Sequence, residues 1–213
     1  MVAYQRLAAV AIAAFTAAVA AKPVSVGGAK AEFDAPASPR GSVVLLPGDA
    51  GLSAADPLQR SSQRFVAKGF AVLAIEQTTV VRAAMKYASE TAMPVSVAAV
   101  SSGVRRLAGA IAAPGFRARK VVFVSGNLDA VREALGAPDA LPPTLVVHHR
   151  ADGCSKTPPA QVERFAQWAG PKVTVRWMEG GSERGDPCGP ESHHGMAGLD
   201  VELVEAISSF LSN

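Results

Sequence analysis

The chain has 213 residues, of which 49% are hydrophobic and 18% charged, and its formal net charge is +3. This length and composition predict one globular domain with a sizeable core, and they exclude an intrinsically disordered chain. The Lys and Arg residues are scattered, and aromatic residues make up only 6%. We therefore expect no nucleic-acid partner, because such partners need a concentrated basic surface.

The first 20 residues differ in composition from the rest of the chain. Arg6 precedes an apolar run that starts at Leu7, and Ala18-Val19-Ala20 is a small-residue cleavage pattern. This layout is typical of a secretory signal peptide. We predict a signal over 1–20 and a single exported domain over 21–213, periplasmic or secreted. The apolar run is short for a membrane span, so we expect no stable membrane insertion after cleavage; an uncleaved anchor is the alternative.

Segments typical of strands alternate with segments typical of helices along the remaining chain. A hairpin is expected over 23–33, around Gly27-Gly28. Buried strands are expected within 42–51, 70–78, 94–103, 120–126, 143–149 and 172–179. Helices are expected within 56–70, 79–91, 104–115, 128–136, 157–171 and 199–211. This alternation predicts a mostly parallel sheet with helices on both faces.

Two of these helices carry specific expectations. Thr157 is placed to cap the helix within 157–171, with Pro158 at its first position. The last helix is expected to bury one face, formed by Val201, Val204, Ile207 and Leu211.

Polar residues follow several of the buried strands, where ligands bind in open α/β sheets. Ser101-Ser102-Gly103 follows the third strand, Asp152 follows the fifth, and His193-His194 comes after the sixth. A nucleophile, an acid and a base therefore occur in the order Ser, Asp, His. The chain has no Walker loop, and "PGDAG" lacks the glycine order of a dinucleotide-binding turn.

Two short stretches, "LVVHHRADGC" and "DPCGPESHHG", hold all four histidines and both cysteines. Two cysteines in an exported chain most simply pair, so we predict a Cys154–Cys188 disulfide. A zinc site built from the same residues is the alternative. Adjacent histidines suit it poorly, because His148 and His149 on a strand point to opposite faces. We predict no metal and no cofactor.

The sequence resembles the α/β-hydrolases over about residues 40–211. The resemblance rests on "VVLLPGDAG", "LQRSSQRFVAKGFAVLAIE", "VAAVSSG", "LVVHHRADGCSKTPP" and "GDPCGPESHHGMAG". The chain looks like a small α/β-hydrolase, close to exported bacterial members that are similar to dienelactone hydrolases and small esterases. The resemblance implies a three-layer α/β-hydrolase fold without a large cap domain. It also implies a small-molecule substrate, an ester or related carbonyl compound, that is hydrolysed through a Ser-Asp-His triad.

The same resemblance implies a role for individual residues. The nucleophile elbow matches 99–103, with Ser101 as the nucleophile. The backbone N–H groups of Ser102 and Asp49 would form the oxyanion hole. Asp152 would be the acid and His194 the base. The chain departs from the motif at its first glycine, which is Ala99.

Other interpretations of these residues stay open at this point. Ser101 and Ser102 also suit the cap of a helix, and Asp152 suits a turn. Asp129 is the alternative acid and His193 the alternative base. His148 and His149 are expected to be packing residues, with at most a supporting role under the site. A catalytically inactive α/β-hydrolase-like binding protein and a metal-dependent protein are the competing functions.

Overall fold

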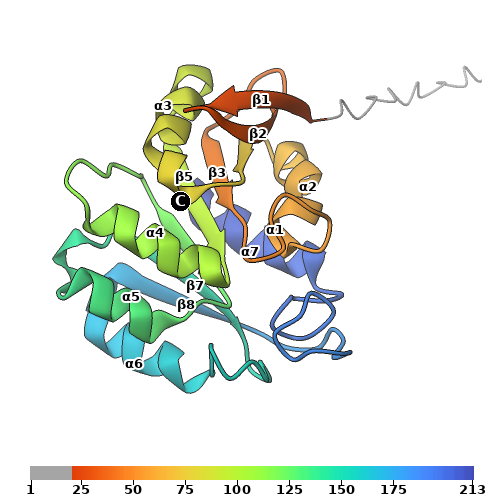
Figure 1. Ribbon diagram of the computed structural model, residues 1–213, viewed down its shortest axis with the longest axis vertical. Coiled ribbons are helices and arrows are strands. Elements are labelled where there is room, and N and C mark those ends of the chain that lie inside the picture. Colours follow the sequence, from red (N-terminus) through yellow and green to blue (C-terminus); the bar gives the residue numbers. More distant parts are fainter. Residues whose placement is uncertain (1–20) are drawn as a thin grey trace, which may run out of the picture.

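A single eight-stranded sheet runs through the protein, whose computed structural model describes residues 21–213 (Figure 1). The signal peptide expected over 1–20 lies outside these residues. The strands are β1 (Lys22–Val26), β2 (Ala29–Asp34), β3 (Ser42–Leu46), β4 (Ala71–Ile75), β5 (Val95–Val100), β6 (Val121–Val124), β7 (Thr144–His149) and β8 (Val173–Met178). Their order is β1-β2-β4-β3-β5-β6-β7-β8, and β3 to β8 are parallel.

The first two strands form the expected hairpin. They pair antiparallel with each other, and β2 also pairs antiparallel with β4. Gly27 and Gly28 make the turn, both with positive φ. The hairpin therefore extends the parallel sheet at one edge.

Helices cover both faces of the sheet, as the alternating pattern predicts. The helices are α1 (Pro57–Arg60), α2 (Ser62–Ala67), α3 (Val81–Thr91), α4 (Ser102–Ala112), α5 (Leu128–Leu135), α6 (Ala160–Ala169) and α7 (Asp200–Ser212). Helices α3, α4, α5 and α6 pack on one face, and α1, α2 and α7 pack on the other. The result is a three-layer α/β domain.

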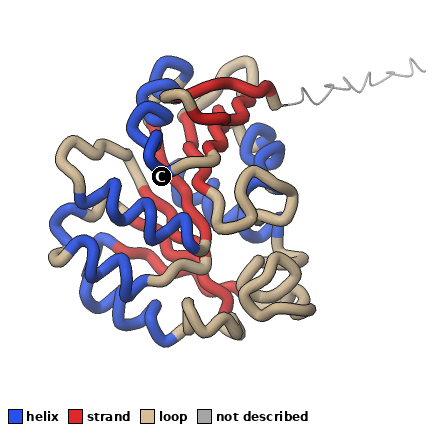
Figure 2. Tube along the Cα trace, in the orientation of Figure 1, coloured by secondary structure: helices blue, strands red, loops and turns tan. Residues whose placement is uncertain are grey.

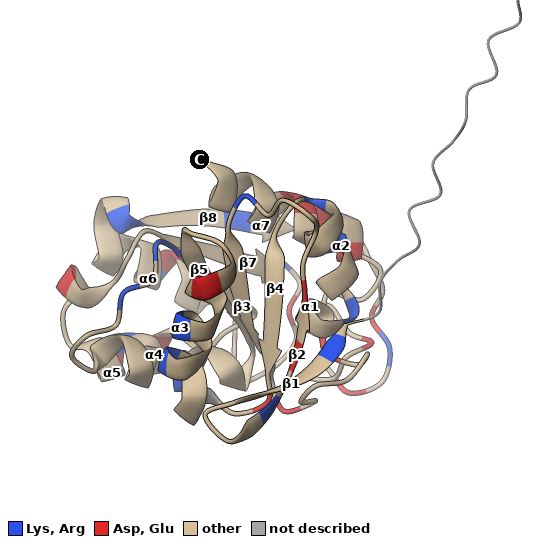
Figure 3. Ribbon diagram, turned by 90° about the horizontal axis from the view of Figure 1, so that it is seen from above, with Lys and Arg blue, Asp and Glu red and all other residues tan. Residues whose placement is uncertain are grey.

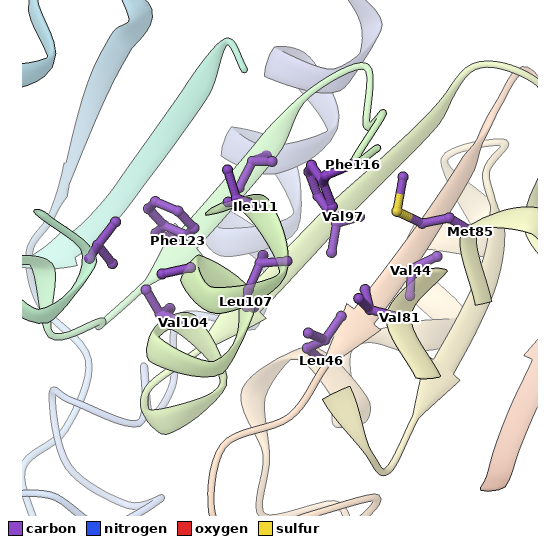
Figure 4. Close-up of a cluster of buried hydrophobic side chains, with 14 of the residues drawn as sticks. Val44, Leu46, Val81, Met85, Val97, Val104, Leu107, Ile111, Phe116 and Phe123 are labelled. Atoms are coloured by element: carbon purple, nitrogen blue, oxygen red, sulfur yellow. The ribbon is translucent and has the colours of Figure 1, made fainter. Parts of the chain in front are cut away.

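The two hydrophobic cores arise from the alternation of side chains along buried strands. In β3, Val44 and Leu46 face the core under α3 and α4, whereas Val43 and Leu45 face the core under α2 and α7. Figure 4 shows the first of these cores, in which Phe123 of β6 also takes part. Because both faces are covered, the central strands are continuous apolar runs.

Three details of the helices differ from the expectation. The helix expected over 56–70 is divided at Ser61 into α1 and α2, because serine has a low helix propensity. Helix α6 begins at Ala160, and Thr157 does not cap it. In α7, Val201 is 51% exposed, and Leu203 occupies the buried face with Val204, Ile207 and Leu211.

The loops that follow the parallel strands gather at one end of the sheet (Figure 2). The longest of them, between β8 and α7, is blue in Figure 1 and lies beside the end of the sheet below α1. Basic and acidic residues are interspersed over the visible elements in Figure 3. None of the helices within residues 21–213 has the length and apolarity needed to cross a membrane.

Two glycines of α4 give a matched test of the strand-to-helix turn. A Cβ at Gly103 would lie 2.5 Å from the carbonyl oxygen of Pro47, whereas a Cβ at Gly109 would meet open space. Gly103→Ala should lower the free energy of unfolding by about 1–3 kcal/mol through overpacking. Gly109→Ala should raise it by up to about 1 kcal/mol because alanine favours helix. Urea denaturation of both variants measures this, and equal effects would contradict the close packing of the turn.

Candidate active site

Ser101 lies on a strained turn between β5 and α4. Its backbone has φ 52° and ψ −123°, a conformation that L-residues rarely adopt. The turn packs closely against the loop after β3, because a Cβ at Gly48 would lie 3.1 Å from the Cβ of Ser101. Although Ser101 precedes α4, its side chain makes no capping hydrogen bond to that helix. The turn presents its hydroxyl at the carboxyl end of the sheet.

His194 bridges Ser101 and Asp152. Its Nε2 is 3.0 Å from Ser101 Oγ, and its Nδ1 is 3.0 Å from Asp152 Oδ2. His194 comes from the loop between β8 and α7, and Asp152 from the loop after β7. With the proton on Nδ1, this ring can accept a hydrogen bond from the Ser101 hydroxyl at Nε2 and donate one to Asp152 at Nδ1.

The Asp152 side chain is fully buried, and every neighbour that contacts its oxygens can donate a hydrogen bond. Cys154 N–H donates to Oδ1 at 2.9 Å, and Thr157 Oγ1 donates to Oδ2 at 3.1 Å. His148 Nε2 lies 3.2 Å from Oδ2. Burial alone would raise the pKa of Asp152, but the hydrogen bonds of His148 and His194 outweigh burial and hold it well below its usual range. Asp152 therefore stays ionised beside His194.

The loop after β3 is held in place by two side chains. Asp56 Oδ2 accepts from Gly48 N–H at 2.8 Å, and its Oδ1 accepts from Leu58 N–H at 3.0 Å. Arg106 of α4 donates to the Pro47 carbonyl at 2.8 Å and to the Gly48 carbonyl at 3.4 Å. In a trans peptide the N–H points opposite to the C=O. Arg106 thus orients the Asp49 N–H away from itself.

The two expected oxyanion donors belong to residues that contact each other. Ser102 Oγ donates to Asp49 Oδ1 at 2.5 Å, and this hydrogen bond lowers the pKa of Asp49. Within residues 21–213, neither the Asp49 N–H nor the Ser102 N–H donates to a protein acceptor. Ser102 also begins α4, where the first N–H groups have no partner inside the helix. Both N–H groups can therefore bind a substrate oxygen.

Two cavities flank Ser101 and His194. One has a volume of about 490 Å³ and a polar wall that includes Arg105, Asn127 and Lys156. The other has a volume of about 310 Å³, and Val100, Pro57 and Pro190 contribute apolar surface to it. A molecule bound across the serine would place one part in each cavity.

The disulfide expected from the sequence is present. Cys154 and Cys188 are bonded, with Cα atoms 4.6 Å apart and 34 positions apart in the chain. Cys154 lies two residues after Asp152, and Cys188 lies in the loop that carries His194. The bridge thus ties the loop of Asp152 to the loop of His194. Within residues 21–213 the structure holds no group of three or more His, Cys, Asp or Glu side chains suited to a metal ion.

The alternative candidates lie apart from Ser101. Asp129 is at the start of α5, where it forms ion pairs with Arg164 at 2.8 Å and Arg132 at 3.7 Å. His193 stacks on His149, with ring centroids 4.1 Å apart. The structure therefore brings together Ser101, Asp152 and His194, and not the alternatives.

Three residues of this arrangement were not expected from the sequence. Thr157 appeared to be a helix cap, but its hydroxyl lies 3.0 Å from His194 Nδ1 and also donates to Asp152. Asp56 and Arg106 were not singled out. The Asp56-Pro57 pair is typical of the N-terminus of a helix, with Asp56 as the cap. Nothing in the sequence marks Arg106.

The architecture is the α/β-hydrolase fold, and many solved structures share it. Est1E from Butyrivibrio proteoclasticus matches with a TM-score of 0.63 and 15% identity, covering 91% of this chain and 98% of that one. An α-β serine hydrolase homologue from Coxiella burnetii matches with a TM-score of 0.65 and 14% identity, covering 93% and 100%. The esterase domain of a Rhodothermus marinus protein matches with a TM-score of 0.66 and 12% identity, covering 89% and 96%. A scan of protein-family models and a search of curated proteins find no match.

Thr157→Val tests the hydroxyl that joins Asp152 and His194. Hydrogen bonds to charged groups contribute roughly 1.5–3 kcal/mol, so this variant should react with a fluorophosphonate at least about tenfold more slowly. Thr144→Val is the matched control, because Thr144 Oγ1 donates only to the Pro142 carbonyl at the other end of β7. Equal reaction rates in the two variants would show that the Thr157 hydroxyl has no role in the site.

Reduction of the disulfide tests whether the bridge orders the two loops. A bridge of this span stabilises the fold by about 3–4 kcal/mol in the chain-entropy model. We expect a thiol reductant to slow fluorophosphonate labelling at temperatures where circular dichroism still shows a folded protein. The Cys154→Ala/Cys188→Ala double variant should label slowly with or without reductant. Simultaneous loss of labelling and fold would argue that the bridge only stabilises the domain.

Proposed function

We propose that this protein is a serine hydrolase that cleaves a small ester or a related carbonyl compound. The observation that carries the proposal is the chain of contacts from Ser101 Oγ through His194 to Asp152, each 3.0 Å long. A serine on a strained turn, beside a histidine that a buried carboxylate orients, is the arrangement that activates an alcohol as a nucleophile. The esterases among the structural neighbours support the same class.

Acylation begins when His194 Nε2 takes the proton of Ser101 as Oγ attacks the substrate carbonyl carbon. The carbonyl oxygen becomes an oxyanion, which the N–H groups of Asp49 and Ser102 stabilise. Imidazolium forms beside the ionised Asp152 and is stabilised by its charge. The Nε2 proton then passes to the leaving alkoxide, which departs as an alcohol and leaves an acyl ester on Ser101.

Deacylation repeats these steps with water. His194 takes a proton from the water as its oxygen attacks the acyl carbon, and the same N–H groups bind the oxyanion. When the tetrahedral intermediate collapses, the proton returns to Ser101 Oγ and the carboxylic acid is released. No metal or cofactor takes part in this proposal.

The surroundings of Ser101 favour small substrates. The segments between strands are short helices and loops, and none forms a cap over the site. The flanking cavities of about 490 Å³ and about 310 Å³ suit an ester with a polar half and a short apolar half.

We also propose that the protein is exported. The disulfide between Cys154 and Cys188 supports this, because such bonds persist in oxidising compartments. The composition of residues 1–20 supports it as well.

The first experiment is fluorophosphonate labelling of oxidised protein spanning residues 21–213, followed by peptide mass mapping. We expect the adduct on Ser101, none in Ser101→Ala, and slowing of labelling by up to about four orders of magnitude in Asp152→Asn. His194→Ala should abolish the adduct, because Ser101 then has no base. A screen of neutral short-chain esters follows a positive result.

Asp129→Asn is the matched control, since it changes the same functional group away from the site. It should label within about twofold of the wild-type rate because surface ion pairs contribute little. Absence of an adduct in correctly folded protein would overturn the hydrolase proposal and leave a non-catalytic binding protein.

A further inference from the structure

A contact between two histidines, His149 and His193, lies one residue along the chain from His194, which contacts Ser101. The rings of His149 and His193 stack almost parallel, at 5° and with centroids 4.1 Å apart. His149 ends β7, three residues before Asp152, and His193 directly precedes His194. The stack therefore joins the loop of the acid to the loop of the base.

The hydrogen bonds of His149 fix it in one neutral form. Its Nδ1 accepts the Ala151 N–H at 3.0 Å, and its Nε2 lies 2.9 Å from the Gly180 carbonyl, to which it must donate. A second proton on Nδ1 would point at the Ala151 N–H, so that two donors would face each other. The protonated ring cannot keep this arrangement.

Glu183 and the Ala151 carbonyl contact His193. Glu183 Oε2 accepts the His193 backbone N–H at 2.6 Å and lies 3.1 Å from its Nδ1. The Ala151 carbonyl is 3.3 Å from the same nitrogen, which places the proton on Nδ1. The His193 ring thus presents its face to His149 and a donor to Glu183.

The charges around His149 come from two loops, the one after β7 and the one after β8. Asp152 lies on its own loop, and Glu183 and His193 lie on the loop after β8. Arg150 is next in the chain, but it lies over the Trp177 ring and pairs with Glu179 at 2.7 Å. Burial, the largest cause, and the charge of His193 lower the pKa of His149. The hydrogen bond to the Gly180 carbonyl and the carboxylates of Asp152 and Glu183 raise it, and the net shift is downward. A proton on this ring is therefore opposed by burial and by His193.

We propose that His149 and His193 are positioning residues for the base loop, and that a single proton on His149 releases the stack and moves His194 away from Ser101. The proposal rests on the hydrolase function proposed above. Catalytic groups tolerate displacements of only about half an ångström. Since His193 and His194 are neighbours in the chain, a shift of one ring is passed to the other.

The proposal predicts how activity depends on pH. Protonation of His194 alone makes log kcat/KM fall with a slope of one in acid. Protonation of His149 adds a second proton, so the slope of the wild-type profile should steepen toward two. Because the folded protein binds the His149 proton less well than the unfolded chain does, the neutral stack has its full stability above the ordinary histidine pKa. It loses that stability as pH falls through the lowered pKa of His149.

The test is the profile of kcat/KM for 4-nitrophenyl butyrate from about pH 8 to about pH 4, read after alkaline quenching. In His149→Gln, the slope of log kcat/KM against pH should stay at one throughout. Its kcat/KM near neutral pH should be about tenfold or more below that of the wild type. His193→Phe keeps a ring against His149 and removes the charge that opposes its proton, so the second step of this variant should move to higher pH. A wild-type slope of one, or equal slopes in wild type and His149→Gln, would overturn the proposal.

Imidazole NMR of the wild-type protein separates this failure from failure of the hydrolase proposal, because it needs no turnover. The chain has four histidines, so single variants assign their signals. The signals of His193 and His194 should shift at the pH where His149 takes its proton, with the disulfide intact. Titration of His149 that leaves His193 and His194 unchanged would overturn the positioning role, even in a protein that hydrolyses no ester.

Discussion

The buried carboxylate of Asp152 is the group on which the arrangement of the site depends. Removing a charge from water is costly unless hydrogen bonds replace the lost solvation. Here the Cys154 N–H, the Thr157 hydroxyl, His148 and His194 supply those bonds. The carboxylate therefore fixes its own loop and, through His194, the loop that follows β8. With fewer hydrogen-bond donors, burial would favour the protonated form of Asp152, which would no longer orient His194 by its charge.

His148 and His149 contact different partners, because β7 is buried on both faces. Successive side chains of a strand point to opposite sides, so His148 and His149 cannot serve one point. His148 contacts Asp152 and faces Trp177 edge-on, whereas His149 stacks on His193. The His149–His193 stack, the contact of His194 with Asp152 and the Cys154–Cys188 bridge all join the loop after β7 to the loop after β8. The two histidine pairs thus take part in connecting the two loops.

Most of the fold could be predicted from the sequence, because buried parallel strands and amphipathic helices leave strong patterns. The elements that were misplaced depend on weaker signals: the division at Ser61, the start of α6 and the exposed Val201. The division at Ser61 reflects the low helix propensity of serine, whereas the other two reflect contacts with segments that are distant in the chain. The α7 face, for example, is decided by which side of the helix meets the sheet, and Leu203 and Val201 are equally apolar in the sequence.

The order of serine, acid and base along the chain pointed to Ser101, Asp152 and His194, but it could not separate His194 from His193. That choice depends on how the loop after β8 folds over the end of the sheet, and local sequence does not determine this. Thr157 and Arg106 were missed for a related reason. A threonine before two prolines is typical of a helix cap, and only the position of Asp152 directs its hydroxyl elsewhere.

Ala99 shows which glycines the turn at Ser101 requires. Its methyl group is fully buried in the core under α3 and α4. Gly103 is different, because a methyl there would meet the Pro47 carbonyl, and Gly48 faces Ser101 closely. The constraint therefore lies where α4 and the loop after β3 approach each other. An alanine at the first motif position leaves that approach intact, so the departure from the motif is no argument against an active serine.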